Sequence, residues 1–98
     1  MLAIQSQTLY FDSSQTLQCH FSFNNIINDY GVVLQGFDMR YDNDTDHKVR
    51  SLGVEINNVS LSTDRTILTA EVKLTLKDNS KNVGSGLVDV VAVVDLKS

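Results

Sequence analysis

Residues 66–77 read Thr-Ile-Leu-Thr-Ala-Glu-Val-Lys-Leu-Thr-Leu-Lys, and this stretch decides the fold class. Its apolar side chains recur at every second position: Leu68, Ala70, Val72, Leu74 and Leu76. Successive side chains of a β-strand point to opposite faces, so a period of two places all of these on one face. Thr, Glu and Lys fill the positions between them. We therefore predict a long strand with one face in the core and the other in water.

Alternating runs on both sides of this stretch predict further strands. The chain has no proline and only five glycines, and Val, Ile, Thr, Phe and Tyr recur in short runs, which is the composition of strands. The expected additional strands cover residues 3–11, 16–23, 32–41, 49–57 and 86–96. With 98 residues, the chain fits one domain, residues 1–98. The prediction is an all-β fold, a six-stranded antiparallel β-sandwich.

Three connections between these strands have their own signals. Residues 12–14 and 62–65 are rich in turn-forming residues. Residues 24–30 break the alternation, so we expect a crossing loop there, with Ile26 and Ile27 capping the core. The apolar side of the following strand changes near Gly36, which predicts a β-bulge.

Cys19 is the only cysteine of the chain, which excludes an internal disulfide. It shares a strand face with Leu17, Phe21 and Phe23, so we expect a small buried hydrophobic side chain. His20 is its neighbour in sequence and points to the opposite face of the strand. The two residues therefore cannot form a Cys-His dyad directly.

The last strand, residues 86–96, is apolar on both faces. A strand with no polar face is normally covered from both sides. In a two-layer sandwich, only another subunit can cover the outer side. We therefore expect an oligomer interface that contains Val91 and Val93. The alternative is a central strand that leaves a few valines exposed, because most protein surfaces keep much apolar area.

Charge and hydropathy exclude several classes of partner. The net charge is −4, and no Lys/Arg cluster could neutralise a run of phosphates, so we expect no nucleic-acid binding. The acidic surplus argues equally against an anionic membrane surface, and no apolar stretch reaches the ~20 residues of a spanning helix. Residues 1–7 lack a secretory leader, so we expect a soluble protein that stays in the cytosol or leaves by another route.

Residues 42–47, Asp-Asn-Asp-Thr-Asp-His, concentrate oxygen ligands beside an imidazole. Aligning Asp42, Asp44 and Asp46 with the first EF-hand ligands puts His47 at the required glycine and Gly53 at the required glutamate, so the EF-hand pattern fails. Three alternatives remain: a solvated hairpin loop, a ligand-contacting rim, and a weak calcium site of another kind. No other cofactor is expected.

The sequence shows no catalytic centre. His20 and His47 are the only histidines and lack metal-site spacing. No nucleophile elbow occurs, and Gly84-Ser85-Gly86 is expected to be a flexible loop segment. Outward-facing acids on strands are usually solvated. We therefore predict that the protein is not an enzyme.

One family resemblance covers residues 50–96. The segment Val54-Glu55-Ile56-Asn57-Asn58-Val59-Ser60 is similar to a strand and an Asn-Val-Ser-like turn of the H-type lectin domain. Residues 66–76 resemble that family's long strand and residues 87–95 its closing strand. The resemblance implies a six-stranded antiparallel sandwich that binds N-acetylgalactosamine-type sugars and forms trimers or hexamers. Related domains of phage baseplate and fibre proteins trimerise.

The chain departs from the family at the end of the final strand. The family's tryptophan is missing there, and the region reads Val93-Val94-Asp95-Leu96. Sugar binding relies on an aromatic surface, so this departure bears on the sugar site. The residues expected at such a site are Asp42, Asp44, Asp46, His47 and Arg50. Two functions follow as expectations: a carbohydrate-binding oligomer, or a structural trimer without a small ligand.

Overall fold

The computed structural model describes residues 1–41, 49–78 and 84–98 and contains six strands in this part of the chain. In chain order they are β1 (Leu2–Phe11), β2 (Gln15–Ser22), β3 (Ile27–Tyr41), β4 (Val49–Leu61), β5 (Ile67–Asp78) and β6 (Gly84–Leu96).

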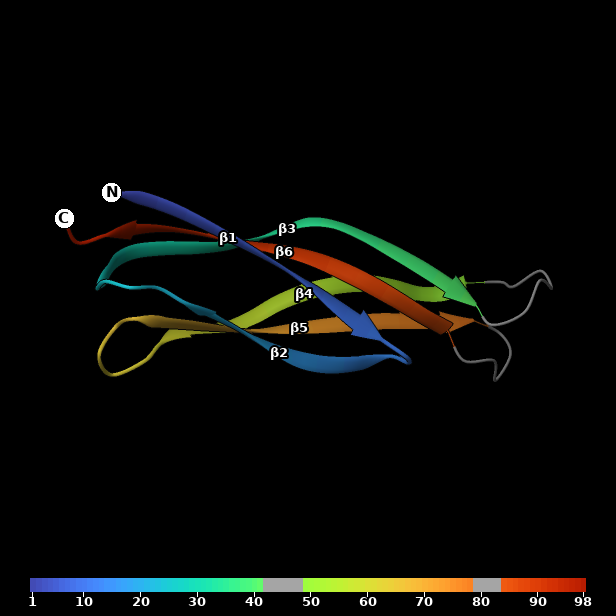
Figure 1. The fold of residues 1–98 in the computed structure, drawn as a ribbon. Helices are drawn as coiled ribbons and strands as arrows, with labels where there is room; N and C mark the ends of the chain where they lie inside the picture. Colours follow the sequence, from blue (N-terminus) through green and yellow to red (C-terminus); the bar gives the residue numbers. More distant parts are fainter. Residues whose placement is uncertain (42–48, 79–83) are drawn as a thin grey trace.

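The strands form two three-stranded sheets, with the orders β1-β6-β3 and β2-β5-β4. Every neighbouring pair is antiparallel. Figure 1 shows the sheets as two elongated layers, with both chain termini at the same end. The predicted fold class, an all-β six-stranded antiparallel sandwich, is confirmed. The strand order could not be predicted, and it places β6 in the centre of its sheet.

The core lies between the sheets and is formed mainly by the two central strands. β5 contributes Leu68, Ala70, Val72 and Leu74, which were the predicted inward side chains. β6 contributes Val88, Val90, Ala92, Val94 and Leu96. Phe21, Cys19 and Phe11 complete the layer from the neighbouring strands. The period-two pattern therefore gave the correct face of β5, whereas β6 is apolar on both parities and has no such pattern.

Three strands extend at least two residues beyond the predicted bounds. β6 begins at Gly84, so the prediction of a flexible loop segment at Gly84-Ser85-Gly86 is wrong. β3 begins at Ile27, so residues 28–30 belong to a strand and not to the predicted loop. Ile27 is fully buried, as expected, whereas Ile26 is partly exposed. β4 continues past Asn57 to Leu61 through a register shift, and Asn58 takes a positive φ of 51° there. The predicted bulge near Gly36 is confirmed by a register shift between Leu34 and Gly36.

The β1/β2 side of the sandwich is closed by side chains that bridge the two sheets. The Gln5 Nε2 donates to the Ser22 carbonyl at 2.6 Å, and the Gln7 amide donates to the His20 carbonyl. Ser14, in the turn between the strands, donates to the Leu76 carbonyl at 3.0 Å and accepts from the Leu76 N–H at 2.8 Å. These bonds satisfy backbone groups at the sheet edges that would otherwise be free to pair with another chain.

The molecule is longer than a typical domain of its size. Its Cα extents are 54 × 19 × 16 Å and its radius of gyration is 16.0 Å, against about 12.6 Å for a compact chain of this length. Its accessible surface is 6185 Å², against about 5600 Å² for a typical monomer of this mass. The elongated shape thus exposes more surface to solvent than a typical monomer of this mass does.

The turn between β4 and β5 fixes where β3 begins. Arg65 has a positive φ of 61°, and its guanidinium donates to the Ile27 carbonyl at 2.9 and 3.1 Å. The Ile27 N–H donates in return to the Arg65 carbonyl at 2.8 Å. Within the turn, Asp64 Oδ1 accepts from the hydroxyls of Ser62 at 2.6 Å and Thr66 at 2.8 Å.

These donors lower the pKa of Asp64 below its usual value of 3.8, because Ser62 and then Thr66 stabilise the ionised carboxylate. A lowered pKa in the folded state adds stability at pH values above 3.8, and this stability is lost as the pH falls through the folded-state pKa. We expect Asp64→Asn to unfold at a lower urea concentration than the native chain at pH 7. The difference should shrink as the pH falls below 3.8. Urea unfolding between pH 7 and pH 2 measures it, with Asp12→Asn as the control.

The thiol of Cys19 is 2% exposed, and burial raises its pKa above the usual 9.0. A thiol that is both covered and protonated reacts slowly with alkylating or disulfide reagents. We expect negligible labelling of the native protein by a thiol-specific chromogenic reagent, with full labelling in urea. Rapid labelling of the native chain would contradict this burial.

Candidate functional site

Most of the predicted ligand-binding residues lie outside the part of the chain that the structure describes. This holds for Asp42, Asp44, Asp46 and His47. The backbone of Arg50 belongs to β4, at a register shift between Val49 and Ser51. The weak calcium site predicted for this loop falls in the same region and stays a prediction.

Val91 and Val93 both lie on the outward side of β6, as predicted. We define the outer face as the outward side of the β1-β6-β3 sheet. It consists of five rows, each with one residue from β1, β6 and β3 in that order. The rows are Leu2-Asp95-Asp29, Ile4-Val93-Gly31, Ser6-Val91-Val33, Thr8-Asp89-Gly36 and Tyr10-Leu87-Asp38.

Large apolar side chains of the outer face stay in contact with solvent. Leu2, Ile4 and Tyr10 are 74%, 69% and 73% exposed, and Val33 is 53% exposed. Val91 and Val93 lie between them and are half-buried by these neighbours. β6 is therefore a central strand, as one of the two alternatives predicted. The outward side of its sheet still carries an uncovered apolar surface.

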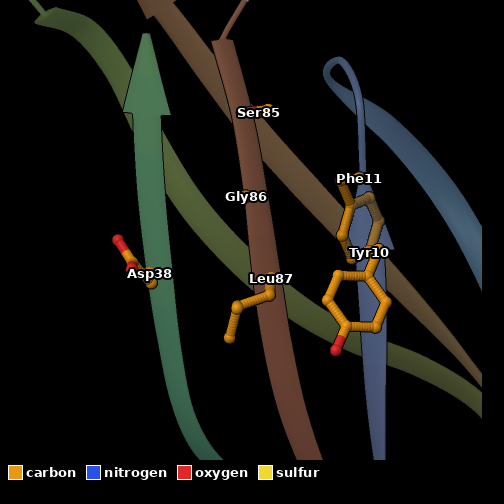
Figure 2. Close-up of a pocket in the computed structure, with 6 residues that line it drawn as sticks. All are labelled: Tyr10, Phe11, Asp38, Ser85, Gly86 and Leu87. Carbon is orange, nitrogen blue, oxygen red and sulfur yellow. The ribbon is translucent and has the colours of Figure 1, made fainter.

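A hollow of about 260 Å³ lies at the Tyr10 end of the outer face. Its lining is Tyr10, Phe11, Asp38, Ser85, Gly86 and Leu87. Figure 2 shows Tyr10 on β1 and Asp38 on β3 to either side of Leu87 on β6. The hollow thus combines an aromatic ring, an aliphatic side chain and a carboxylate.

A second hollow of about 290 Å³ lies at the opposite end of the same face. Its lining includes the apolar residues Leu2, Gly31 and Val93 and the carboxylate-bearing residues Asp29 and Asp95. A Cβ atom at Gly31 would meet no atom within 4 Å, so the absent side chain leaves open space here. The amino group of Met1 donates to Asp95 Oδ1 at 2.8 Å.

The outward side of the β2-β5-β4 sheet is different, because its side chains are polar and pair with one another. His20 Nδ1 lies 2.9 Å from the Thr69 hydroxyl. The Asn58 amide donates to Glu71 at 2.8 Å. This side therefore has the wet surface that the alternation of β5 predicted.

Cys19 and His20, the pair considered as a dyad, lie on opposite sides of β2. Cys19 is buried and His20 is exposed on the other side of β2, as predicted. No group of three or more His, Cys, Asp or Glu side chains in the described ranges could hold a metal ion. No helix in residues 1–41, 49–78 or 84–98 has the length and apolarity needed to cross a membrane. The outer face is therefore the main candidate site.

Comparison with models of known protein families gave no match, and neither the curated proteins nor the solved structures gave a significant one. The resemblance to H-type lectins thus stays a prediction.

Sequence reasoning missed the contribution of β1 to the outer face. Leu2, Ile4 and Tyr10 share one parity of a strand whose other parity holds Leu9 and Phe11. This two-sided apolar pattern was a usable signal, similar to that of β6. The sequence gives no sign that Asp29 and Asp95 lie opposite each other, because this depends on which strands pair.

Proposed function

We propose that this chain is a non-catalytic assembly module that associates with further copies of itself through the outer face of the β1-β6-β3 sheet. The observation that carries the proposal is the exposure of Leu2, Ile4 and Val33 around Val91 and Val93. Contiguous apolar surface on a small protein marks a contact site, and burying it supplies the free energy of association.

The size of the outer face suits a second copy. Three strands at a spacing of ~4.8 Å and about nine residues at ~3.4 Å each give a flat area on the order of 450 Å². Side-chain relief raises this toward the ~800 Å² per partner of a standard interface. The elongated shape and the high accessible surface of the single chain fit a subunit that is completed by a neighbour.

Val91→Lys tests this proposal. An unpaired ammonium group in an apolar contact costs several kcal/mol, so we expect the dissociation constant of the assembly to rise at least about a hundredfold. Light scattering and sedimentation of the native chain and the variant over a range of concentrations measure the change. Val93→Lys should act in the same way.

Gln18→Lys is the matched control, because Gln18 is exposed on the outward side of the other sheet. It adds the same charge without touching the outer face and should leave the mass unchanged. A native chain that stays monomeric at every concentration, or equal effects of all three lysine variants, would refute assembly through this face.

Carbohydrate binding is a second proposal, and the hollow at Tyr10 favours it. An exposed aromatic ring can stack against the apolar side of a sugar, and a carboxylate can accept from sugar hydroxyls. Tyr10 is 73% exposed beside Asp38, so an aromatic surface is present although the chain has no tryptophan. His47 and Arg50 stay candidates for a sugar site on the sequence alone.

Glycan retention on a column or array tests the second proposal. We expect Tyr10→Ala to lose retention if the hollow holds the sugar, and His47→Ala or Arg50→Ala to lose it if the loop does. Tyr10→Phe keeps the ring and should keep most of the retention. Full retention by all three alanine variants, or no retention by the native chain, would exclude these residues as a sugar site.

A further inference from the structure

β3 has one edge without a neighbouring strand. It pairs with β6 on one side and is the outermost strand of its sheet on the other. Alternate residues of an edge strand point their N–H and C=O groups away from the sheet, where another strand can bond to them. Within the described part of the chain, no group bonds to this side of residues 31–37. β3 spans 15 residues and contains neither proline nor lysine, two residues that commonly block the pairing of an edge.

The space between the two sheets is also open along this edge. Leu34 and Phe37 lie opposite Val90 and Val88 of β6, which are buried, so both point to the inner side of the sheet. They are nevertheless 41% and 52% exposed, and neither belongs to the core or packs against it. The β1/β2 side, in contrast, is closed by side chains that bridge the sheets. Two large inward-pointing side chains of β3 therefore lack the cover that the core residues have.

The bulge of β3 limits how an identical strand can pair with this edge. Before the bulge, even-numbered residues such as Leu34 point inward, and after it odd-numbered residues such as Phe37 do. Residues directly opposite each other in a sheet must lie on the same face. A pairing of β3 with a second β3 that spans both sides of the bulge must therefore be centred on it. One such register places Leu34 of each copy opposite Phe37 of the other.

We infer that β3 pairs antiparallel with β3 of a second copy along this edge, with Leu34 opposite Phe37 of that copy. The two uncovered side chains of each copy then cover those of the other, and the edge-facing backbone groups of residues 31–37 gain partners. In this register Asp38 lies opposite Val33, so the Asp38 carboxylates of the two copies do not face each other. The partner is a second copy because the edge is complementary to itself in backbone groups, in side chains and in the position of its bulge.

This pairing also enlarges the outer face. A two-fold axis perpendicular to the sheet keeps the outward sides of both copies on one surface, with the strand order β1-β6-β3-β3-β6-β1. The flat area of one outer face, on the order of 450 Å², then doubles to about 900 Å² and exceeds the ~800 Å² per partner of a standard interface. The inference goes beyond the proposed function and does not rest on it, since edge pairing requires no contact at the outer face.

Two cysteine variants test the register. Directly opposite residues of antiparallel strands bring their Cβ atoms to about 5 Å, whereas diagonal neighbours lie ~7–8 Å apart, too far for an unstrained disulfide. We expect an equal mixture of Leu34→Cys and Phe37→Cys chains to form at least about fivefold more covalent dimer under mild oxidation than either variant alone. The native chain, whose Cys19 is buried, gives the background. No dimer from the mixture, or equal amounts from the mixture and the single variants, would overturn the inference.

Amide hydrogen exchange tests the same edge without any substitution. A backbone N–H that gains a partner exchanges more slowly. We expect the edge-facing amides of residues 31–37 to exchange at least about tenfold more slowly in concentrated than in dilute solutions of the native chain. The amides of the turn at residues 12–14 serve as the internal control. Equal exchange of residues 31–37 at every concentration would refute the pairing.

Lysine variants separate the edge from the outer face. Leu34→Lys places a charge at the paired edge and should abolish the concentration-dependent protection of residues 31–37, whereas Val91→Lys should preserve it. Ile67→Lys is the control, because Ile67 is an exposed apolar side chain of β5 that belongs to neither surface. If Val91→Lys removes the protection and Leu34→Lys does not, association uses the outer face alone and the pairing of the β3 edges is wrong.

Discussion

The position of β6 between β1 and β3 is the constraint on which the rest of the structure depends. One strand supplies backbone hydrogen bonds to both neighbours, and Val88, Val90, Ala92 and Val94 on its inner side fill the core. Its register with β1 runs without interruption from Leu2 to Phe11. A central strand whose outward side is mainly apolar can therefore hold the sheet together and still leave apolar groups pointing outward.

The outward sides of the two sheets differ in polarity. β5, the central strand of the second sheet, alternates cleanly, so its outward side carries Glu71 and Lys73 and is wet. β6 has Val91 and Val93 in the equivalent positions, with Asp89 and Asp95 as the polar interruptions. This asymmetry gives the elongated sandwich one polar outer surface and one largely apolar outer surface.

The sequence predicted most of the fold because the deciding signals are local. The alternation of residues 66–77, the loss of alternation in β6 and the bulge near Gly36 each depend on near neighbours in the chain. The early start of β3 was missed because Asn28 and Asp29 are poor strand formers. The strand begins there because the Ile27 N–H donates to the Arg65 carbonyl and the Arg65 guanidinium donates to the Ile27 carbonyl. Local propensity cannot anticipate such a contact.

The candidate site was less predictable than the fold. Val91 and Val93 share one parity of β6, but strand geometry alone does not show which parity points outward, because both parities are apolar. Both hollows depend on the alignment of three strands that are far apart in the sequence. Tyr10 meets Leu87, and Asp29 meets Asp95, only through the β1-β6-β3 order. The alternation within one strand can identify residues that point outward. It cannot show which of them become neighbours when distant strands pair.

The closeness of the two chain ends has a mechanical consequence. The Met1 amino group and carbonyl bond to the Leu96 carbonyl and N–H, and β1 runs antiparallel to β6 from that point. A force that pulls Met1 and Leu96 apart acts first on the hydrogen bonds between these two residues and then on each following pair. The strands would therefore separate one residue pair at a time. A tether at the Phe11 end of β1 and another at the Leu96 end of β6 would load the whole ladder in shear. The β1/β6 pair would therefore resist tension better when the force is applied at opposite ends of its ladder than when it is applied at Met1 and Leu96.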